Sequence, residues 1–440
     1  MSTCGAVPAV LRAGLALAVA GGLAVPLGCS KPPSRPNVLL ISVDTLRADH
    51  LGCYRYRRPT SAFIDSLAAS GVLFESAFSP SPWTLPGHAS MLTGVSPFRH
   101  GATQETRGIR EDIALLPEAL RASGYQTVGI INGPFVRGRY GFSRGFETFV
   151  EVFDRKDESY LPRLLEIFEG LDGRPFFAFV HFMQVHSPYA APAPHRFNAE
   201  RGPTAAADGR RMMELDRRVR AREVQLTEQD RDYLIALYDS GIRAVDRMVA
   251  ETVARARLRA GGRLLVVLTS DHGEEFLEHG GLLHGRTLYD EALHVPLIIA
   301  GAGVPMGKRV DRLASLLDVV PTILGVAGVP VPAGVEGRNL LAGAGSDSSL
   351  LVPLQTSAHD GNAHLRGART ASRKVITDDL SGHITFFALD QDPGEQHPAA
   401  VQLFDPLLGF LRGLRVPPTS GLRPPEGSEL EALRSLGYHD

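Results

Sequence analysis

The sequence predicts an α/β protein built on a doubly wound, mostly parallel β-sheet, with a smaller C-terminal α+β domain. Apolar runs at residues 37–43 and 176–182 are typical of strands buried on both faces of such a sheet. Helical patterns alternate with these runs from residue 37 to about residue 341. After the small-residue segment 343–349 the pattern changes to short, closely spaced strand-like runs. We therefore expect two domains, a large domain at 37–342 and a smaller C-terminal domain at 343–440.

The helices and strands expected in the large domain follow from its apolar runs and helical patterns. We expect strands at 37–43, 72–78, 127–131, 176–182, 264–268 and 295–300, and helices at 60–70, 115–123, 160–171, 227–259 and 318–327. Thr227 and the acidic residues after it cap the longest helix, and Gly261-Gly262 ends it. Residues 132–146 and 190–222 are expected to be loops, the second with some helix.

The C-terminal domain is expected to hold a small antiparallel sheet. Its strands are predicted at 350–355, 366–370, 374–377 and 384–389, and its helices at 399–411 and 430–436.

The N-terminus resembles a targeting segment. Arg12 precedes an apolar run at 13–27, which is short for a membrane span and ends at Gly28-Cys29. This predicts a signal peptide at 1–28 of the bacterial lipoprotein type, lipidation of Cys29, and a Pro-rich linker at 29–36. Plain secretion and a retained anchor are the alternatives. The protein is thus expected in a bacterial cell envelope, periplasmic or outer-surface, touching the membrane only through this anchor.

Composition limits the other possibilities. The chain has 440 residues, 44% of them hydrophobic, and a net charge of −2, which gives no support for nucleic-acid binding. After processing at Cys29, Cys53 would be the one unmodified cysteine, so no disulfide within the mature chain is expected.

A polar loop at 82–94 leads into a short helix and contains the first candidate site residue. Pro86 and the small residues after it suit the first turn of a helix. If Thr84 stands at that helix start, its hydroxyl faces free N–H groups that favour an anionic ester oxygen. A Thr that only caps the helix is the alternative.

Two further candidates follow buried strands. Asp44 ends the first strand, and Asp271-His272 follow the strand at 264–268. The carboxyl ends of such strands are where open α/β sheets bind ligands. Two carboxylates, a hydroxyl and an imidazole suit one divalent cation of the Mn²⁺, Zn²⁺ or Ca²⁺ type. That cation would activate Thr84 as a nucleophile.

Several blocks in the right order make the chain resemble the sulfatase family of the alkaline phosphatase superfamily. They are Asn37-Val38-Leu39-Leu40-Ile41-Ser42-Val43-Asp44, the block from Thr84 to Gly94, His186-Ser187-Pro188-Tyr189, Ser270-Asp271-His272-Gly273-Glu274, Tyr289-Asp290-Glu291 and Asp390-Gln391-Asp392-Pro393-Gly394-Glu395. The resemblance implies a large α/β domain, a C-terminal domain with a four-stranded antiparallel sheet, and a metal at the strand ends.

The chain also departs from that family. Sulfatases proper carry a Cys or Ser that becomes formylglycine in a Cys-x-Pro-x-Arg block, where this chain has Thr84-Leu85-Pro86-Gly87-His88. Thr45 replaces a second acid, and no lysine lies between Lys156 and Lys308, where the family places an active-site lysine. The chain instead resembles relatives with a Thr nucleophile, among them phosphoethanolamine transferases and nucleotide phosphodiesterases.

This resemblance implies a role for each candidate. Thr84 attacks and carries the ester intermediate, and Asp44, Asp271 and His272 hold the metal with Thr84 as a further ligand. His186 and His284 contact the transferred group or protonate the leaving group. Arg286 would supply positive charge lost with the lysines, whereas His88, His100 and His181 are expected to be structural or to support the ligands.

Three functions remain open from the sequence. The first is an exported metal-dependent hydrolase of sulfuric or phosphoric esters, with an anionic ester of a glycan or lipid as substrate. The second is a phosphoryl or phosphoethanolamine transferase acting on envelope glycans or lipids. The third is a non-catalytic glycan-binding descendant, which has no need of a nucleophile at Thr84.

Overall fold

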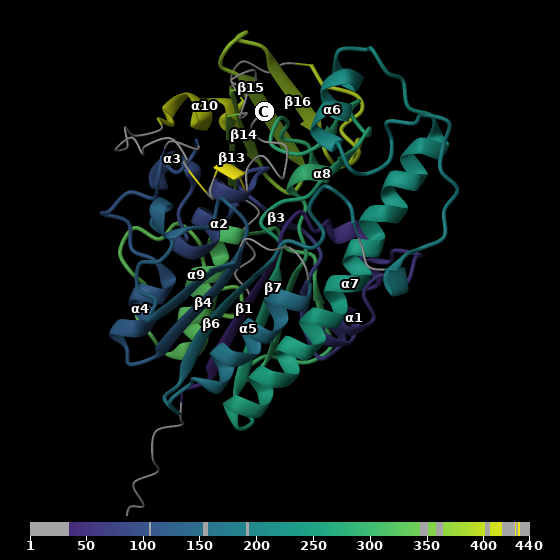
Figure 1. Cartoon of the computed structure of the whole chain (residues 1–440). Coiled ribbons are helices and arrows are strands. Elements are labelled where there is room, and N and C mark those ends of the chain that lie inside the picture. Colours follow the sequence, from purple (N-terminus) through teal and green to yellow (C-terminus); the bar gives the residue numbers. More distant parts are fainter. Residues whose placement is uncertain are drawn as a thin grey trace, which may run out of the picture. The chain divides into compact units, whose positions relative to one another are not determined.

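In the computed structural model the polypeptide forms a large sheet covered by helices, with a second sheet near the C-terminus (Figure 1). The structure describes residues 35–104, 107–152, 157–190, 193–343, 351–357, 364–400, 405–415, 427 and 430–431. The expected signal peptide, Cys29, most of the linker and nearly all of the helix expected at 430–436 lie outside these residues. Residues 35–440 group as one compact unit.

The large sheet has eight strands in the order β11-β2-β10-β7-β1-β6-β4-β5. The strands are β1 (Asn37–Val43), β2 (Gly71–Phe74), β4 (Gln126–Asn132), β5 (Thr148–Val152), β6 (Phe176–Phe182), β7 (Leu264–Thr269), β10 (Leu297–Gly301) and β11 (Lys308–Val310). β1 pairs in parallel with both β6 and β7, and β4 pairs in parallel with β5 and β6. Only β10 among them runs antiparallel to its neighbours, so the predicted mostly parallel sheet is confirmed.

Helices cover both faces of this sheet. The helices of this part of the chain, of which α3 and α8 lie outside these two layers, are α1 (Ala62–Ala69), α2 (Thr84–Thr93), α3 (Pro97–His100), α4 (Leu116–Ala122), α5 (Asp157–Glu169), α6 (Met212–Arg220), α7 (Glu228–Ala260), α8 (Asp290–Leu293) and α9 (Val319–Ala327). Alternate side chains of β1 point to opposite faces, as a strand requires. Leu39 and Ile41 pack with α1, α5 and α7, whereas Val38 and Leu40 pack with α2, α4 and α9. The fold is therefore doubly wound, as predicted.

Short elements complete this part of the chain. β3 (Ala77–Phe78) pairs with β12 (Ala314–Ser315), and β8 (Glu275–Phe276) pairs with β9 (Leu282–Leu283). Single 3₁₀ turns lie at Ala48–His50, Gly52–Tyr54, Gly138–Tyr140, Ala193–His195 and Leu316–Asp318.

Helix α7 begins and ends where its sequence predicts. The Thr227 side chain accepts a hydrogen bond from the Asp230 N–H, and the Asp230 carboxylate accepts one from the Thr227 N–H. This reciprocal pair satisfies N–H groups that the first turn leaves without a helical acceptor. Gly261 then ends the helix with a left-handed backbone, at φ 58°.

The C-terminal sheet is a four-stranded antiparallel meander. Its strands are β13 (Val352–Ser357), β14 (His364–Arg369), β15 (Arg373–Asp378) and β16 (Ile384–Ala388), and α10 (Pro406–Gly413) covers one face. The other face packs on Phe78, Leu288 and Leu293 of the large domain. The boundary at 342/343 stays a prediction, because residues 344–350 lie outside the described part.

A buried charge cluster connects the C-terminal sheet to the segment around α8 of the large domain. Lys374 of β15 is fully buried and donates to Leu288 O at 2.8 Å and to the Asp290 carboxylate at 2.6 Å. Its Nζ also lies 2.5 Å from Glu395 Oε1. Lys374 and Arg369 hold the pKa of Asp290 below its usual range despite its burial. The opposite charges compensate the desolvation of these groups.

Some elements differ from the sequence prediction. The expected strand 72–78 is two strands, β2 and β3, because the chain leaves one sheet and joins another. The strand β5 was not predicted, since it is an edge strand with a half-exposed, polar-containing pattern. The helix expected from residue 399 is observed from Pro406, while residues 401–404 are outside the described part.

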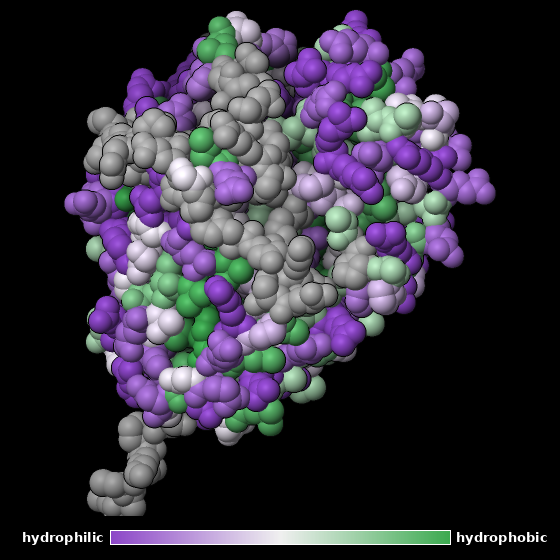
Figure 2. All heavy atoms as spheres, viewed as in Figure 1, coloured by the Kyte–Doolittle hydropathy of each residue, from purple (hydrophilic) through white to green (hydrophobic). Residues whose placement is uncertain are grey.

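The face of the molecule drawn in Figure 2 is largely polar where its residues are described. On the face drawn in Figure 2, hydrophilic side chains surround smaller hydrophobic areas. Large hydrophobic side chains that the described residues expose are scattered: Leu258, Met306, Val331, Leu380 and Phe410. A search of the described helices finds none that is long and apolar enough to cross a membrane.

Candidate active site

The candidate site lies where three neighbouring parallel strands end. Asp44 directly follows β1, and its N–H donates to Phe182 O of β6 at 2.8 Å. Asp271 and His272 follow β7, on the other side of β1. Strand order β7-β1-β6 therefore brings together side chains that are more than two hundred residues apart in the sequence.

Asp44, Asp271 and His272 form a buried group of potential metal ligands. One ligand atom from each lies within 4.8 Å of the others. His272 Nε2 is 3.6 Å from Asp44 Oδ1 and 3.3 Å from Asp271 Oδ2. His272 Nδ1 donates to Gly273 O at 2.9 Å, so Nε2 is the nitrogen with an available lone pair.

Two features of Asp44, Asp271 and His272 suit a bound cation. One is the presence of carboxylate oxygens without a hydrogen bond from the described part of the chain, and the other is the type of ligand atoms. Asp44 Oδ1 and Asp271 Oδ2 are buried and accept no hydrogen bond from the described residues. Buried carboxylate oxygens are costly without a positive partner. Two carboxylates and an imidazole are a donor set that Mn²⁺ or Zn²⁺ accepts. The residues present therefore fit a divalent metal ion.

The pKa values of the two acids reflect their proximity. Burial, together with the charge of Asp271, raises the pKa of Asp44 to about 7. Burial acts in the same direction on Asp271, but His272 and His88 outweigh it and hold the pKa of Asp271 below its usual range. Burial lowers the pKa of His272, which favours the neutral imidazole that a metal ligand must be.

Thr84 lies against this group at the start of α2. It is the first helical residue, after Trp83 in an extended conformation, and its side chain is buried. Its Oγ1 is 3.5 Å from Asp44 Oδ2 and 3.4 Å from His272 Nε2. The N–H groups of Thr84 and Leu85 belong to the first turn, where the helix itself offers no acceptor. The hydroxyl thus faces the potential metal ligands beside the positive end of a helix.

Gly87 allows this close approach. A Cβ added at Gly87 would lie 2.6 Å from Asp271 O, a backbone atom that cannot move aside. Any larger residue would push the first turn of α2 away from the loop after β7. The glycine in the block from Thr84 to His88 is therefore needed for the distance between Thr84 and the ligand group.

Two further histidines, His88 and His181, lie next to the carboxylates of the potential metal ligands. His88 Nδ1 donates to Thr84 O at 2.9 Å and lies 3.2 Å from Asp271 Oδ2. Ser42 Oγ lies 2.9 Å from His88 Nε2. His181 Nε2 is 3.1 Å from Asp44 Oδ2. His88 and His181 thus contact both carboxylates, as the sequence analysis expected of residues that support the ligands.

His186 and His284 lie on the other side of His272. The ring centroid of His284 is 4.3 Å from that of His272 and 4.9 Å from that of His186. Both side chains are buried or nearly so. The structure therefore brings together in one region all the predicted site residues that it describes: Asp44, Thr84, His186, Asp271, His272 and His284.

Glu274 is a part of this region to which the sequence analysis gave no role. Its Oε1 lies 2.7 Å from His284 Nδ1, and its Oε2 accepts from Tyr189 OH at 3.1 Å. Burial raises its pKa to about 8. The sequence did contain a signal for Glu274, because it is the last residue of the sulfatase-like block Ser270-Asp271-His272-Gly273-Glu274. Its contact with His284 depends on β8 and β9, which sequence reasoning did not predict.

Two other basic residues have partners elsewhere. Arg286 Nε is 3.5 Å from Asp216 Oδ2 of α6, so its charge is shared with that carboxylate. His100 Nε2 is 3.1 Å from Ser90 Oγ within the α2–α3 region, and burial lowers the pKa of His100 to about 3. The structural role expected for His100 agrees with these contacts.

Comparisons with known proteins agree with this geometry. A model of the sulfatase family, described as "Sulfatase", matches residues 36–329. The sulfatase YidJ of Escherichia coli (strain K12) is 24% identical over 87% of this chain and 88% of its own. A Delta 4,5-hexuronate-2-O-sulfatase of Bacteroides thetaiotaomicron is 24% identical over 72% of this chain and 74% of its own.

Solved structures share the fold. The phosphonate monoester hydrolase of Agrobacterium radiobacter superposes with a TM-score of 0.66 at 20% identity, over 83% of this chain and 91% of that one. The family match spans the elements that carry Asp44, Thr84, Asp271 and His272. With its fold shared and more than half of its length matched by the family model, this chain belongs to the sulfatase family of hydrolases.

Proposed function

We propose that this chain is an exported, metal-dependent hydrolase that cleaves phosphoric and sulfuric esters with Thr84 as its nucleophile. The observation that carries the proposal is the position of Thr84 Oγ1, within 3.5 Å of both Asp44 Oδ2 and His272 Nε2. A threonine that served only as a helix cap would not need to face a buried group of carboxylates and imidazoles.

Members of the sulfatase family bind a divalent metal ion, and Asp44, Asp271 and His272 are the residues that would hold it here. A bound divalent cation would supply Lewis-acid polarisation of the substrate and lower the pKa of a nearby hydroxyl. Mn²⁺, Zn²⁺ and Ca²⁺ are the ions that this set of donors suits.

The reaction then proceeds in two displacements. Thr84 Oγ attacks the phosphorus or sulfur atom, its proton passes to Asp44 Oδ2 at 3.5 Å, and the bond to the alcohol oxygen breaks as that oxygen takes a proton, which gives a covalent ester of Thr84. Water attacks the same atom in the second step and restores the Thr84 hydroxyl. The N–H groups of the first turn of α2 stabilise the charge on the equatorial oxygens in both steps.

His284 is the residue we assign to protonate the departing alcohol. Its contact with Glu274 at 2.7 Å fixes the orientation of the ring next to His272. His186 extends the same group of rings and is proposed to contact the transferred group. An imidazole suits this task because it changes charge near neutral pH.

A threonine nucleophile favours phosphoric over sulfuric esters. A formylglycine hydrate releases its sulfate ester by elimination, which threonine cannot do because it carries a single hydroxyl. The Thr84 ester must therefore be cleared by direct attack of water. A phosphoryl group tolerates that attack when a cation and backbone N–H groups neutralise its charge.

A panel of aryl esters tests the proposed function. Purified protein supplied with Mn²⁺, Zn²⁺ or Ca²⁺ is expected to release 4-nitrophenol from phosphate monoesters and diesters at least as fast as from the sulfate ester. Activity should be the same with or without a formylglycine-generating enzyme in the expression host. Hydrolysis of the aryl sulfate alone would contradict the preference for phosphoric esters, and transfer to an added alcohol without net hydrolysis would favour a transferase.

Export and lipid anchoring are a separate part of the proposal. The apolar run that ends at Gly28-Cys29 motivates it, and these residues lie outside the described part of the chain. Cys29→Ser is expected to move the protein from the membrane fraction to the soluble fraction of a bacterial host, as detected by immunoblot. Equal fractionation of the two proteins would rule out lipidation at Cys29.

A further inference from the structure

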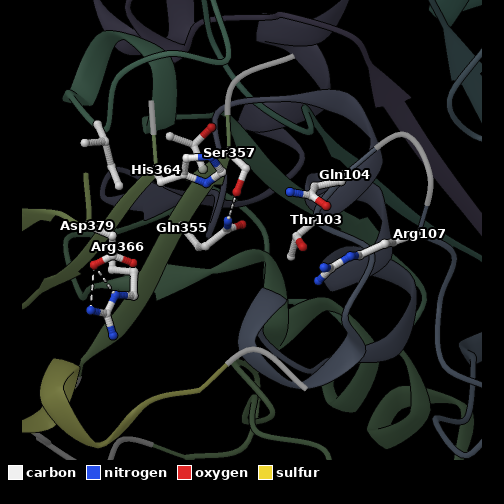
Figure 3. Close-up of a pocket in the computed structure, with 10 residues that line it drawn as sticks. Thr103, Gln104, Arg107, Gln355, Ser357, His364, Arg366 and Asp379 are labelled. Atoms are coloured by element: carbon white, nitrogen blue, oxygen red, sulfur yellow. Dashed lines mark hydrogen bonds and ion pairs between the residues drawn. The ribbon is translucent and has the colours of Figure 1, made fainter. Parts of the chain in front are cut away.

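A cavity of about 170 Å³ lies between the segment after α3 and the first two strands of the C-terminal sheet (Figure 3). The polar residues that line it are Thr103, Gln104 and Arg107 on one side and Gln355, Ser357 and His364 on the other. One water needs only about 10–15 Å³, so the space can hold a larger polar group.

The cavity contains a buried acceptor with no partner. Gln355 is 4% exposed, and its Nε2 donates to Ser357 Oγ at 2.9 Å. Its Oε1 is buried and has no hydrogen bond among the described residues. Figure 3 shows Gln355 on the β13 side of the cavity, opposite Thr103 and Arg107. Buried amide oxygens normally accept a hydrogen bond, so a bound ligand would supply the missing donor to Gln355 Oε1.

Arg107 gives the cavity its charge. Arg366 and Asp379, which also line it, neutralise each other through hydrogen bonds of 2.8 and 2.6 Å. No hydrogen bond or ion pair engages the Arg107 side chain within the part of the chain that the structure describes, and Figure 3 shows it directed towards Gln355. A guanidinium group that has no carboxylate partner within the described protein can bind the carboxylate of a ligand through two parallel hydrogen bonds.

Backbone contacts place this cavity beside the candidate active site. The Gln355 N–H donates to Pro80 O at 2.9 Å, four residues before Thr84. Thr356 Oγ1 donates to Gly285 O at 2.6 Å, and Gly285 directly follows His284. The strand β13 thus connects the cavity to both loops that carry the proposed nucleophile and proton donor.

We infer that this cavity is the subsite for the alcohol side of the substrate, and that it takes an acidic sugar. Arg107 would bind the sugar carboxylate, while the amides of Gln104 and Gln355 and the hydroxyls of Thr103 and Ser357 would bind the ring hydroxyls. Neutral hydrogen-bonding groups around one cation match a uronic acid better than an inorganic anion or an apolar chain. The inference rests on the proposed function for the position of the ester itself.

Ligand-observed NMR titration of the full chain with methyl β-D-glucuronide tests the subsite. Methyl β-D-glucoside is the control ligand, because it differs in having a hydroxymethyl group in place of the carboxylate. The glucuronide is expected to bind, and the glucoside to bind about tenfold to a hundredfold more weakly, as expected for loss of one charged hydrogen bond. Arg107→Met should weaken glucuronide binding by the same factor.

Arg110→Met is the matched control variant. Arg110 lies three residues further along the same segment, but it pairs with Asp112 and does not line the cavity. It should leave glucuronide binding unchanged, and thermal unfolding of both variants should show that each is folded. Gln355→Leu should weaken binding of both sugars, since the amide contacts the ring in either ligand.

The outcomes separate this inference from the proposed function. Equal binding of the glucuronide to wild type and Arg107→Met, or equal competition by acetate, would overturn the subsite. Aryl ester hydrolysis without any glucuronide binding would overturn it too, while the proposed hydrolase would stand. Arg107-dependent binding in a protein that hydrolyses no ester would support the sugar site and contradict the proposed hydrolase.

Discussion

Asp271→Ala is expected to abolish both metal binding and turnover while leaving the fold intact. Asp271 contributes one of three potential ligand atoms, and Asp44 and His272 alone make an incomplete site. Metal content per chain, measured by elemental analysis after dialysis, should fall from about one divalent ion to almost none. Turnover of any accepted aryl ester should fall with it.

The same substitution should remove the stabilisation that metal gives. At pH 8, above the pKa of about 7 of Asp44, the metal-free protein holds two buried, charged carboxylates close together. Added metal neutralises them in the native state only, so it should raise the Tm of the wild type. Asp271→Ala relieves this repulsion, so its metal-free Tm should not fall far, and added metal should not raise it.

A control variant makes this result specific. Asp216→Ala removes a buried acid that pairs with Arg220 in α6, outside the ligand group. It should retain metal even if it loses stability. Stoichiometric metal in Asp271→Ala would contradict the assignment of the ligands.

The positions of the potential metal ligands could be predicted because they depend on one rule of α/β sheets. Asp44 and Asp271 each follow a buried apolar strand, and such strands end at the same edge of the sheet. The pattern does not state which strands are neighbours. The adjacency of β7, β1 and β6 comes from the whole topology, and it turns two separate acids into one site.

The supporting contacts could not be predicted in this way. His88 reaches the Asp271 carboxylate because Gly87 lets α2 pack against the loop after β7, a distance that no local pattern encodes. Glu274 meets His284 only through the small β8–β9 pairing. The antiparallel direction of β10 was missed for a similar reason, since its apolar run is equally compatible with either direction.

Thr84→Ala is expected to lower kcat for phosphoric ester hydrolysis by about a thousandfold or more, as removal of a nucleophile does. The variant keeps Asp44, Asp271 and His272, so it should still bind metal. Thr84→Ser should keep measurable activity, because it retains a hydroxyl at the start of α2. Mass spectrometry of wild type quenched during turnover should find the phosphoryl group on Thr84, and none on Thr84→Ala.

Thr84→Cys tests whether the site uses a threonine nucleophile or can still be converted to a formylglycine site. Conversion to the aldehyde needs an Arg at the position where this chain has His88, and His88 already contacts both Thr84 O and Asp271. Co-expression with a formylglycine-generating enzyme should therefore leave the cysteine unmodified and should not raise aryl sulfate hydrolysis. An aldehyde at this position, with sulfatase activity above that of the wild type, would show that the site still follows formylglycine chemistry. Full activity of Thr84→Ala would instead show that attack comes from water directly, with the ligand group intact but no covalent intermediate.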